Sequence, residues 1–140
     1  MVLPIALFVT LKFGLVNPKV LILVENLKEV YKYHLFLDRC QIPNIGLYNH
    51  ENPIDLKFYN LSLWMNGPTN FMVATKDIYL DLESNIFKES CKKNFKKDHF
   101  ALTNLATVVC INLQHLKKSF NKILNNFNHK PFIMTFVENK

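Results

Sequence analysis

The sequence predicts an α/β domain in which helices flank a mostly parallel sheet of five or more strands. Short apolar runs rich in β-branched residues alternate with longer segments whose apolar residues recur at helical spacing. The run from Phe71 to Thr75 continues directly into Lys76 and Asp77, which is typical of a buried parallel strand that ends in polar residues. At 140 residues, 49% of them hydrophobic, the chain is long enough for one domain, residues 1–140, with its own core.

The chain is predicted to begin with a helix and then a strand. Apolar residues recur at helical spacing from Pro4 to Phe13, and Gly14 is a suitable stop. The apolar start could suggest a signal peptide, but it has no basic beginning and no small-residue cleavage pattern, so we expect a core-facing helix. After a break, residues 19–24 form a β-branched run that predicts the first strand.

Two helices and a short strand are predicted next. Asn26 followed by Glu29 resembles a capping box and starts a helix that ends near Cys40. The face of this helix that we expect to be buried comprises Leu27, Val30, Tyr31, His34, Leu35 and Leu37. Residues 44–48 are a short strand, and Asn52-Pro53 opens a second helix that runs to Asn66-Gly67.

The second half continues the alternation around one unusual segment. The strand at residues 71–75 is followed by residues 84–104, called the basic segment, in which lysines alternate with phenylalanines. A strand at 105–111, a helix at 114–126 and a last strand at 131–137 complete the chain. Strands that alternate with helices predict a parallel sheet with right-handed crossovers.

The chain is basic, and its basic residues are almost all lysines. The formal net charge is +6, and of 17 basic residues only Arg39 is an arginine. A basic surface favours a polyanion such as RNA, although it also serves solubility. The three cysteines Cys40, Cys91 and Cys110 have no metal-ligand spacing, so we expect reduced thiols and no metal or cofactor.

No established catalytic motif is present. Gly14, Gly46 and Gly67 cannot be combined into a phosphate-binding loop, so this domain is not expected to hold a triphosphate alone. Asp81 and Glu83 could act as a general acid and base, but two carboxylates after a strand more often belong to a solvated turn.

Several segments occur in a characteristic order. VLILVENLKEVYKYHLFLDRCQIPNIGLYNHENP is followed by MNGPTNFMVATKD, VVCINL, SFNKILNN and KPFIMTFVENK. This series resembles the second RecA-like domain of DEAD-box RNA helicases, from its motif IV strand to its closing strand. The resemblance covers nearly all of the chain, with the basic segment as an insertion, and implies a RecA-like three-layer sandwich.

The segments that match motifs V and VI depart from the family. Motif V in the family reads roughly A-T-D-x-x-x-R-G-x-D, and Ala74 and Thr75 are retained here. Lys76 replaces the first aspartate and Leu80 replaces the arginine. Asp81 replaces the glycine and Glu83 replaces the last aspartate. Motif VI there reads H-R-x-G-R-x-x-R. It corresponds here to a segment that starts at Asn121 and Lys122 and has amides, Asn125 and Asn128, at both arginine-finger positions. Because Arg39 is the only arginine, no realignment supplies two fingers.

The resemblance therefore implies a catalytically inactive domain that binds RNA or acts as a scaffold. The expected RNA contacts are residues at strand ends and lysines of the basic segment, namely Thr75, Lys76, Asn26, Asn49, His50, Lys92, Lys93, Lys96 and Lys97. Two alternatives remain open: Thr75 caps the next helix, and the lysines form a solvated loop.

Degenerate helicase domains of this kind are typical of the Yb group of Tudor-domain proteins in the piRNA pathway. This likeness implies other domains of a longer protein, ribonucleoprotein granules and single-stranded RNA as the partner. A cytoplasmic location without a membrane is expected because the apolar start of the chain is too short to span a bilayer. A second hypothesis is a homodimerisation module that binds no RNA. A third is half of an ATP-dependent RNA helicase that needs a partner RecA-like domain.

Overall fold

Five parallel strands form one sheet at the centre of the fold. The computed structural model describes residues 2–12, 19–66, 69–78, 81, 107–113 and 132–137. In chain order the elements are α1 (Val2–Lys12), β1 (Val20–Val24), α2 (Leu27–Arg39), β2 (Ile45–Tyr48), α3 (Ile54–Asn66), β3 (Phe71–Thr75), β4 (Thr107–Ile111) and β5 (Phe132–Phe136). These bounds confirm every strand and helix predicted within the described ranges, to within about two residues.

The order of the strands places β1 in the middle of the sheet. The strands β2, β3, β1 and β4 lie side by side in that order, and β5 pairs with the far side of β4. Ile22 of β1 is in register with Val73 on one side and Val109 on the other, and every strand pair is parallel. All residues of β1 are buried, as expected for a central parallel strand. The five carboxyl ends therefore share one edge of the sheet, called the carboxyl edge.

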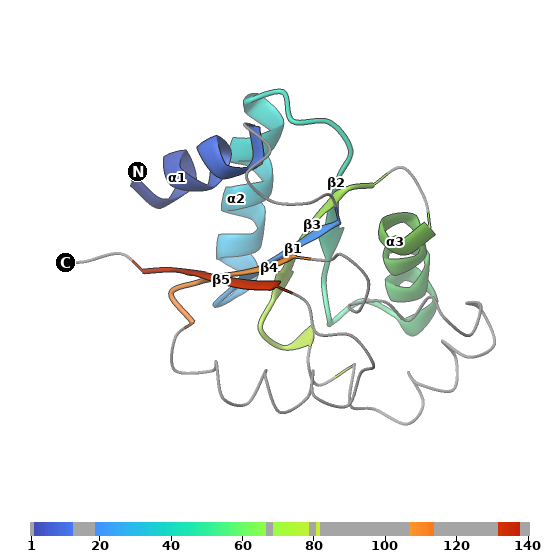
Figure 1. Ribbon diagram of the computed structural model, residues 1–140. Coiled ribbons are helices and arrows are strands. Elements are labelled where there is room, and N and C mark those ends of the chain that lie inside the picture. The colour runs from blue at the N-terminus through green and yellow to red at the C-terminus, as the bar shows by residue number, and fades with distance from the viewer. Residues whose placement is uncertain are drawn as a thin grey trace.

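Helices cover both faces of the sheet. Figure 1 shows α1 and α2 on one side and α3 on the other. Because side chains alternate along a strand, Val20, Ile22 and Val24 face the first layer and join a core with Leu7 and Leu37 of the two helices. Among the side chains of α3 that the structure describes, Phe58, Leu61 and Trp64 are buried. This arrangement confirms the predicted α/β class with a parallel sheet.

The buried face of α2 differs from the prediction. Val30, Tyr33 and Leu37 are buried, whereas Tyr31 and Leu35, predicted to be buried, are 53% and 48% exposed. The sequence of α2 offers two apolar stripes more than a third of a turn apart, and the stripe of Val30 and Leu37 faces the sheet. Tyr31 and Leu35 form the other stripe, on the outside of the helix.

The first helix packs as predicted on its inner side. Leu3, Leu7 and Leu11 of α1 are buried, while Ile5 and Val9 are exposed. No helix within the described ranges is long and apolar enough to cross a membrane. The basic segment and the predicted helix at 114–126 lie outside the described residues.

A lysine anchors the amino end of β1. Lys19 adopts a left-handed backbone conformation with φ of 70°. Its Nζ donates a hydrogen bond to the carbonyl oxygen of Thr69 at 2.9 Å, and partial burial lowers the pKa of its ammonium group. This contact ties the approach to β1 to the approach to β3, at the edge opposite the carboxyl edge.

Candidate functional site at the carboxyl edge

Polar residues follow three neighbouring strands at the carboxyl edge. They are Asn49 and His50 after β2, Lys76 and Asp77 after β3, and Glu25 and Asn26 after β1. The chain leaves β1 into α2 on one face of the sheet, and it leaves β2 into α3 on the other face (Figure 1). In open α/β sheets, ligands bind outside the carboxyl ends of the strands where such connections diverge. This row is therefore the candidate functional site.

Glu25 and Lys76 form an ion pair in the middle of this row. Val24 and Thr75 are in register, and the backbone N–H of Lys76 donates to the carbonyl oxygen of Val24 at 2.9 Å. The next residue of each strand is thereby placed opposite the other, and Lys76 Nζ donates to Glu25 Oε1 at 2.6 Å. The Lys76 side chain is 29% exposed and that of Glu25 is 44% exposed, so the pair lies at the surface.

The two predicted asparagines hold the loops in shape. Asn26 is the N-cap of α2, and its Oδ1 accepts a hydrogen bond from the backbone N–H of Glu29 at 3.0 Å, as the capping-box pattern predicted. Asn49 Oδ1 accepts from the backbone N–H of Glu51 at 2.9 Å, which closes the turn after β2. These bonds are local, and the contact of either residue with RNA stays a prediction.

Thr75 is enclosed rather than presented at the surface. Its side chain is 1% exposed, and Oγ1 has no hydrogen-bond partner in the described part of the chain. Alternation along β3 places Thr75 on the same face as Val73, which belongs to the α1–α2 core. The hydroxyl caps no helix in the described part of the chain, and its contact with an RNA phosphate stays a prediction. Contact between Thr75 and RNA would require the groups that cover it to move.

His50 and Asp77 face each other from the loops after β2 and β3. His50 Nδ1 lies 3.9 Å from Asp77 Oδ2, which is too far for a hydrogen bond. The Nδ1 atom is itself buried and makes no hydrogen bond to the described residues. The remainder of both side chains is partly exposed, so both are available at the carboxyl edge.

A polar cluster beneath the edge was not predicted. Asp81 Oδ2 accepts a hydrogen bond from the Tyr48 hydroxyl at 2.8 Å, and both Asp81 oxygens accept from Lys57 Nζ at 3.1 Å. Lys57 Nζ also donates to the carbonyl oxygen of His50 at 3.2 Å. This Asp81 latch, formed by Tyr48, Lys57 and Asp81, joins β2, α3 and the segment after β3. From the sequence, Asp81 was predicted to pair with Glu83 either as a general acid and base or in a solvated turn. Glu83 lies outside the described residues.

The only arginine lies at the opposite end of the sheet. Arg39 is the last residue of α2, which starts at the carboxyl edge and runs back along the sheet (Figure 1). A helix of 13 residues spans about 20 Å. Arg39 therefore cannot supply charge to a ligand at the carboxyl edge.

The remaining predicted residues give no further chemistry within the described ranges. There, no group of three or more His, Cys, Asp and Glu side chains is arranged to hold a metal ion. Cys40 is a partly buried free thiol and Cys110 is buried in β4, while Cys91 lies outside the described residues. The lysines and amides predicted at positions 92, 93, 96, 97, 121, 122, 125 and 128 also lie outside them.

Comparison with known proteins does not identify a family. The sequence matches no protein-family model and no curated protein. Any likeness to helicase domains therefore depends on the sequence segments quoted above, and the fold itself is established as a parallel α/β sheet with helices.

Proposed function

We propose that this chain is a non-catalytic RNA-binding module with a RecA-like, three-layer fold, and that RNA binds along the carboxyl edge. The observation that carries the proposal is the row of accessible polar side chains from Asn49 and His50 to Lys76 and Glu25, contributed by three neighbouring strands. The setting implied by the resemblance, ribonucleoprotein granules of the piRNA pathway, belongs to the proposal and depends on the sequence segments alone.

Charge and glycine content support the non-catalytic part of this proposal. Transfer of a phosphoryl group requires a backbone cradle for the phosphates and cations that offset the developing charge. The chain has three glycines in no cradle pattern, and Arg39 lies at the far end of α2. A domain of this kind retains a surface for a nucleic acid backbone without the groups that hydrolysis needs.

Lys76 is the only lysine in this row, and a carboxylate already neutralises it. Lys76 is paired with Glu25, and Lys57 beneath the row is paired with Asp81. The chain as a whole carries a net charge of +6, to which the lysines at 92, 93, 96 and 97 contribute. The net charge of the whole chain would thus attract RNA over a long range. Lys76 and its neighbours would determine where the RNA lies along the edge.

Binding of single-stranded RNA is expected to weaken steeply with salt. Fluorescence anisotropy with a labelled oligouridylate should give a logarithm of Kd that rises linearly with the logarithm of salt concentration. Lys76→Gln should weaken binding about threefold and reduce the slope by about 0.7, the value for one phosphate contact of a single strand. Arg39→Gln, which removes one positive charge at the opposite end of the sheet, is the matched control and should change less.

Two results would contradict the proposal. One is the absence of RNA binding at low salt, and the other is binding that responds equally to Lys76→Gln and Arg39→Gln. The second result would indicate attraction by net charge without a defined edge.

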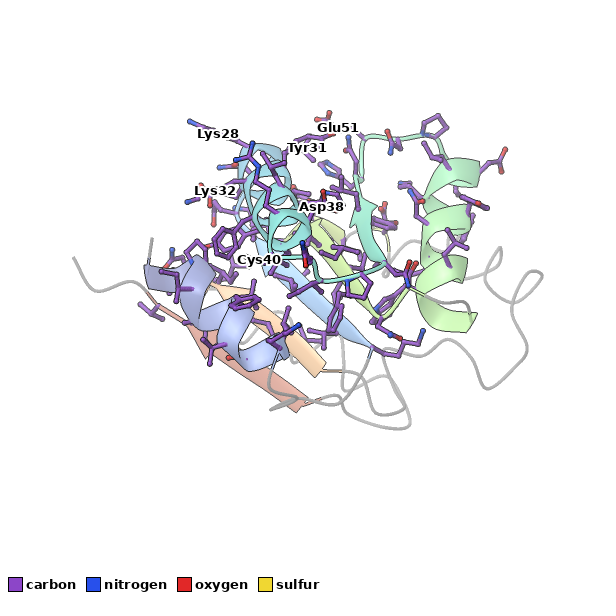
Figure 2. All side chains as sticks on the ribbon, turned by 90° about the horizontal axis from the view of Figure 1, so that it is seen from above. Lys28, Tyr31, Lys32, Asp38, Cys40 and Glu51 are labelled. Atoms are coloured by element: carbon purple, nitrogen blue, oxygen red, sulfur yellow. The ribbon has the colours of Figure 1, made fainter. Side chains whose placement is uncertain are left out.

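The exposed stripe of α2 favours a second candidate function, self-association. Tyr31 and Leu35 lie one helical turn apart and are about half exposed. Figure 2 shows Tyr31 on the outside of α2, between Lys28 and Glu51. Apolar side chains in one stripe are typical of a surface that packs against another protein.

If this stripe forms a homodimer, the sedimentation coefficient should increase with protein concentration. Leu35→Asp should then abolish the increase, because a buried carboxylate in an apolar interface lacks a partner. Leu56→Asp, at an exposed apolar position of α3, is the control. A monomer at all concentrations would exclude this candidate.

A further inference from the structure

The Glu25 carboxylate accepts a hydrogen bond from the ammonium group of Lys76, the lysine that the proposed function places against RNA. We infer that Glu25 competes with RNA phosphates for the Lys76 ammonium group and so limits the affinity of the carboxyl edge for RNA. The inference rests on the proposed function, because it concerns the same edge and the same ligand. It identifies a carboxylate that competes with RNA for this lysine.

The parallel register places the competitor beside the cation. Val24 and Thr75 are paired, and the Lys76 N–H donates to the Val24 carbonyl oxygen, so Glu25 and Lys76 emerge opposite each other. The distance of 2.6 Å between Nζ and Oε1 is typical of a charge-assisted hydrogen bond. A phosphodiester oxygen would bind the ammonium group by the same interaction, so phosphate and carboxylate exclude each other along this direction.

The ion pair between Glu25 and Lys76 is exposed enough for a phosphate to replace the carboxylate. Glu25 is 44% exposed, and its carboxylate has no second hydrogen-bond partner among the described residues. Surface ion pairs of this kind contribute little net stability. Asp81 differs, since it accepts from both Tyr48 and Lys57 and is only 18% exposed. Of these two carboxylates, Glu25 is the one that a phosphate can displace without breaking the fold.

Displacing Glu25 from Lys76 lowers the affinity for RNA as long as the Glu25 carboxylate stays charged. A phosphate bound to Lys76 would lie next to the released carboxylate, and like charges at that separation repel each other. Neutralising Glu25 should remove both the competition and the repulsion. The effect should act through Lys76, which distinguishes it from a general increase in positive charge.

The test compares Glu25→Gln with the wild-type chain in the oligouridylate anisotropy titration at low salt. The variant should bind about three- to fivefold more tightly, the range that corresponds to the loss of a competing surface pair. Its salt slope should stay close to that of the wild type, because Lys76 contacts the same single phosphate in both proteins. Asp38→Asn, which removes one negative charge near the far end of α2, is the matched control and should bind like the wild type.

The double variant Glu25→Gln/Lys76→Gln decides the mechanism. The gain from Glu25→Gln should disappear in the Lys76→Gln background, since the two residues act as one unit. A gain that persists there, or no gain over Asp38→Asn, overturns the inference while the proposed function stands. If neither the wild type nor Glu25→Gln binds, with both folded by circular dichroism, the proposed function fails and the inference with it. Binding by Glu25→Gln alone would also contradict the proposed function, because the wild-type chain would then not bind RNA.

Discussion

Replacing Asp81 with alanine should lower the free energy of unfolding by about 2–4 kcal/mol. Asp81 accepts hydrogen bonds from Tyr48 and from Lys57, whose side chain is 11% exposed. Removing the carboxylate leaves a mostly buried ammonium group without its anion, which costs about 3–5 kcal/mol when the site is fully buried. The residual exposure and the bond from Lys57 to the His50 carbonyl oxygen reduce this cost. Urea denaturation followed by circular dichroism measures it.

Tyr48→Phe provides the comparison for this prediction. It removes one hydrogen bond to Asp81 and leaves the Lys57 ion pair in place, so the expected loss is about 1 kcal/mol. If Asp81→Ala cost no more than Tyr48→Phe, the Asp81 latch would not hold β2, α3 and the segment after β3 together. Equal losses would therefore contradict the structural role assigned to the latch.

Leu7→Ala should destabilise the chain by about 2–5 kcal/mol, the range for a fully buried leucine. Leu7 is completely buried and belongs to the core between the sheet and its helices. The change removes apolar contacts and leaves a cavity beside β1. Thermal or urea unfolding would report the loss directly.

Ile5→Ala is the matched control on the same helix. Ile5 is 52% exposed, and its truncation should change the free energy of unfolding by about 0.5 kcal/mol or less, as for most surface substitutions. A loss at Ile5 as large as the loss at Leu7 would contradict the packing of α1, because it would mean that the outer side of this helix is also buried.

The fold was predictable where the apolar pattern is local. The run Phe71–Thr75 was predicted to be a strand with its observed bounds, and Asn26 was predicted to cap the helix that it caps. The buried face of α2 was predicted only in part: Val30 and Leu37 are buried as predicted, but Tyr31 and Leu35 are exposed and Tyr33 is buried instead. The choice between the two stripes depends on which one the sheet accommodates, and that is a property of the tertiary structure.

The candidate site was predictable in position but not in its pairings. Residues that follow parallel strands meet at one edge, so Asn49, His50 and Lys76 were expected there. The bond between Lys76 and Glu25 requires the register of β1 and β3, which only the structure provides. The Asp81 latch likewise joins residues from three elements, and no spacing in the sequence indicates it.

The central place of β1 has a consequence for how the chain folds. Both neighbours of β1, the strands β3 and β4, are synthesised long after it, with α2, β2 and α3 in between. On a ribosome, the apolar residues of β1 stay unpaired while these elements emerge. Closing loops over such long sequence separations also slows folding. During that interval β1 offers two unpaired edges to other nascent chains, so the ribosome-bound protein is the state most exposed to misassembly.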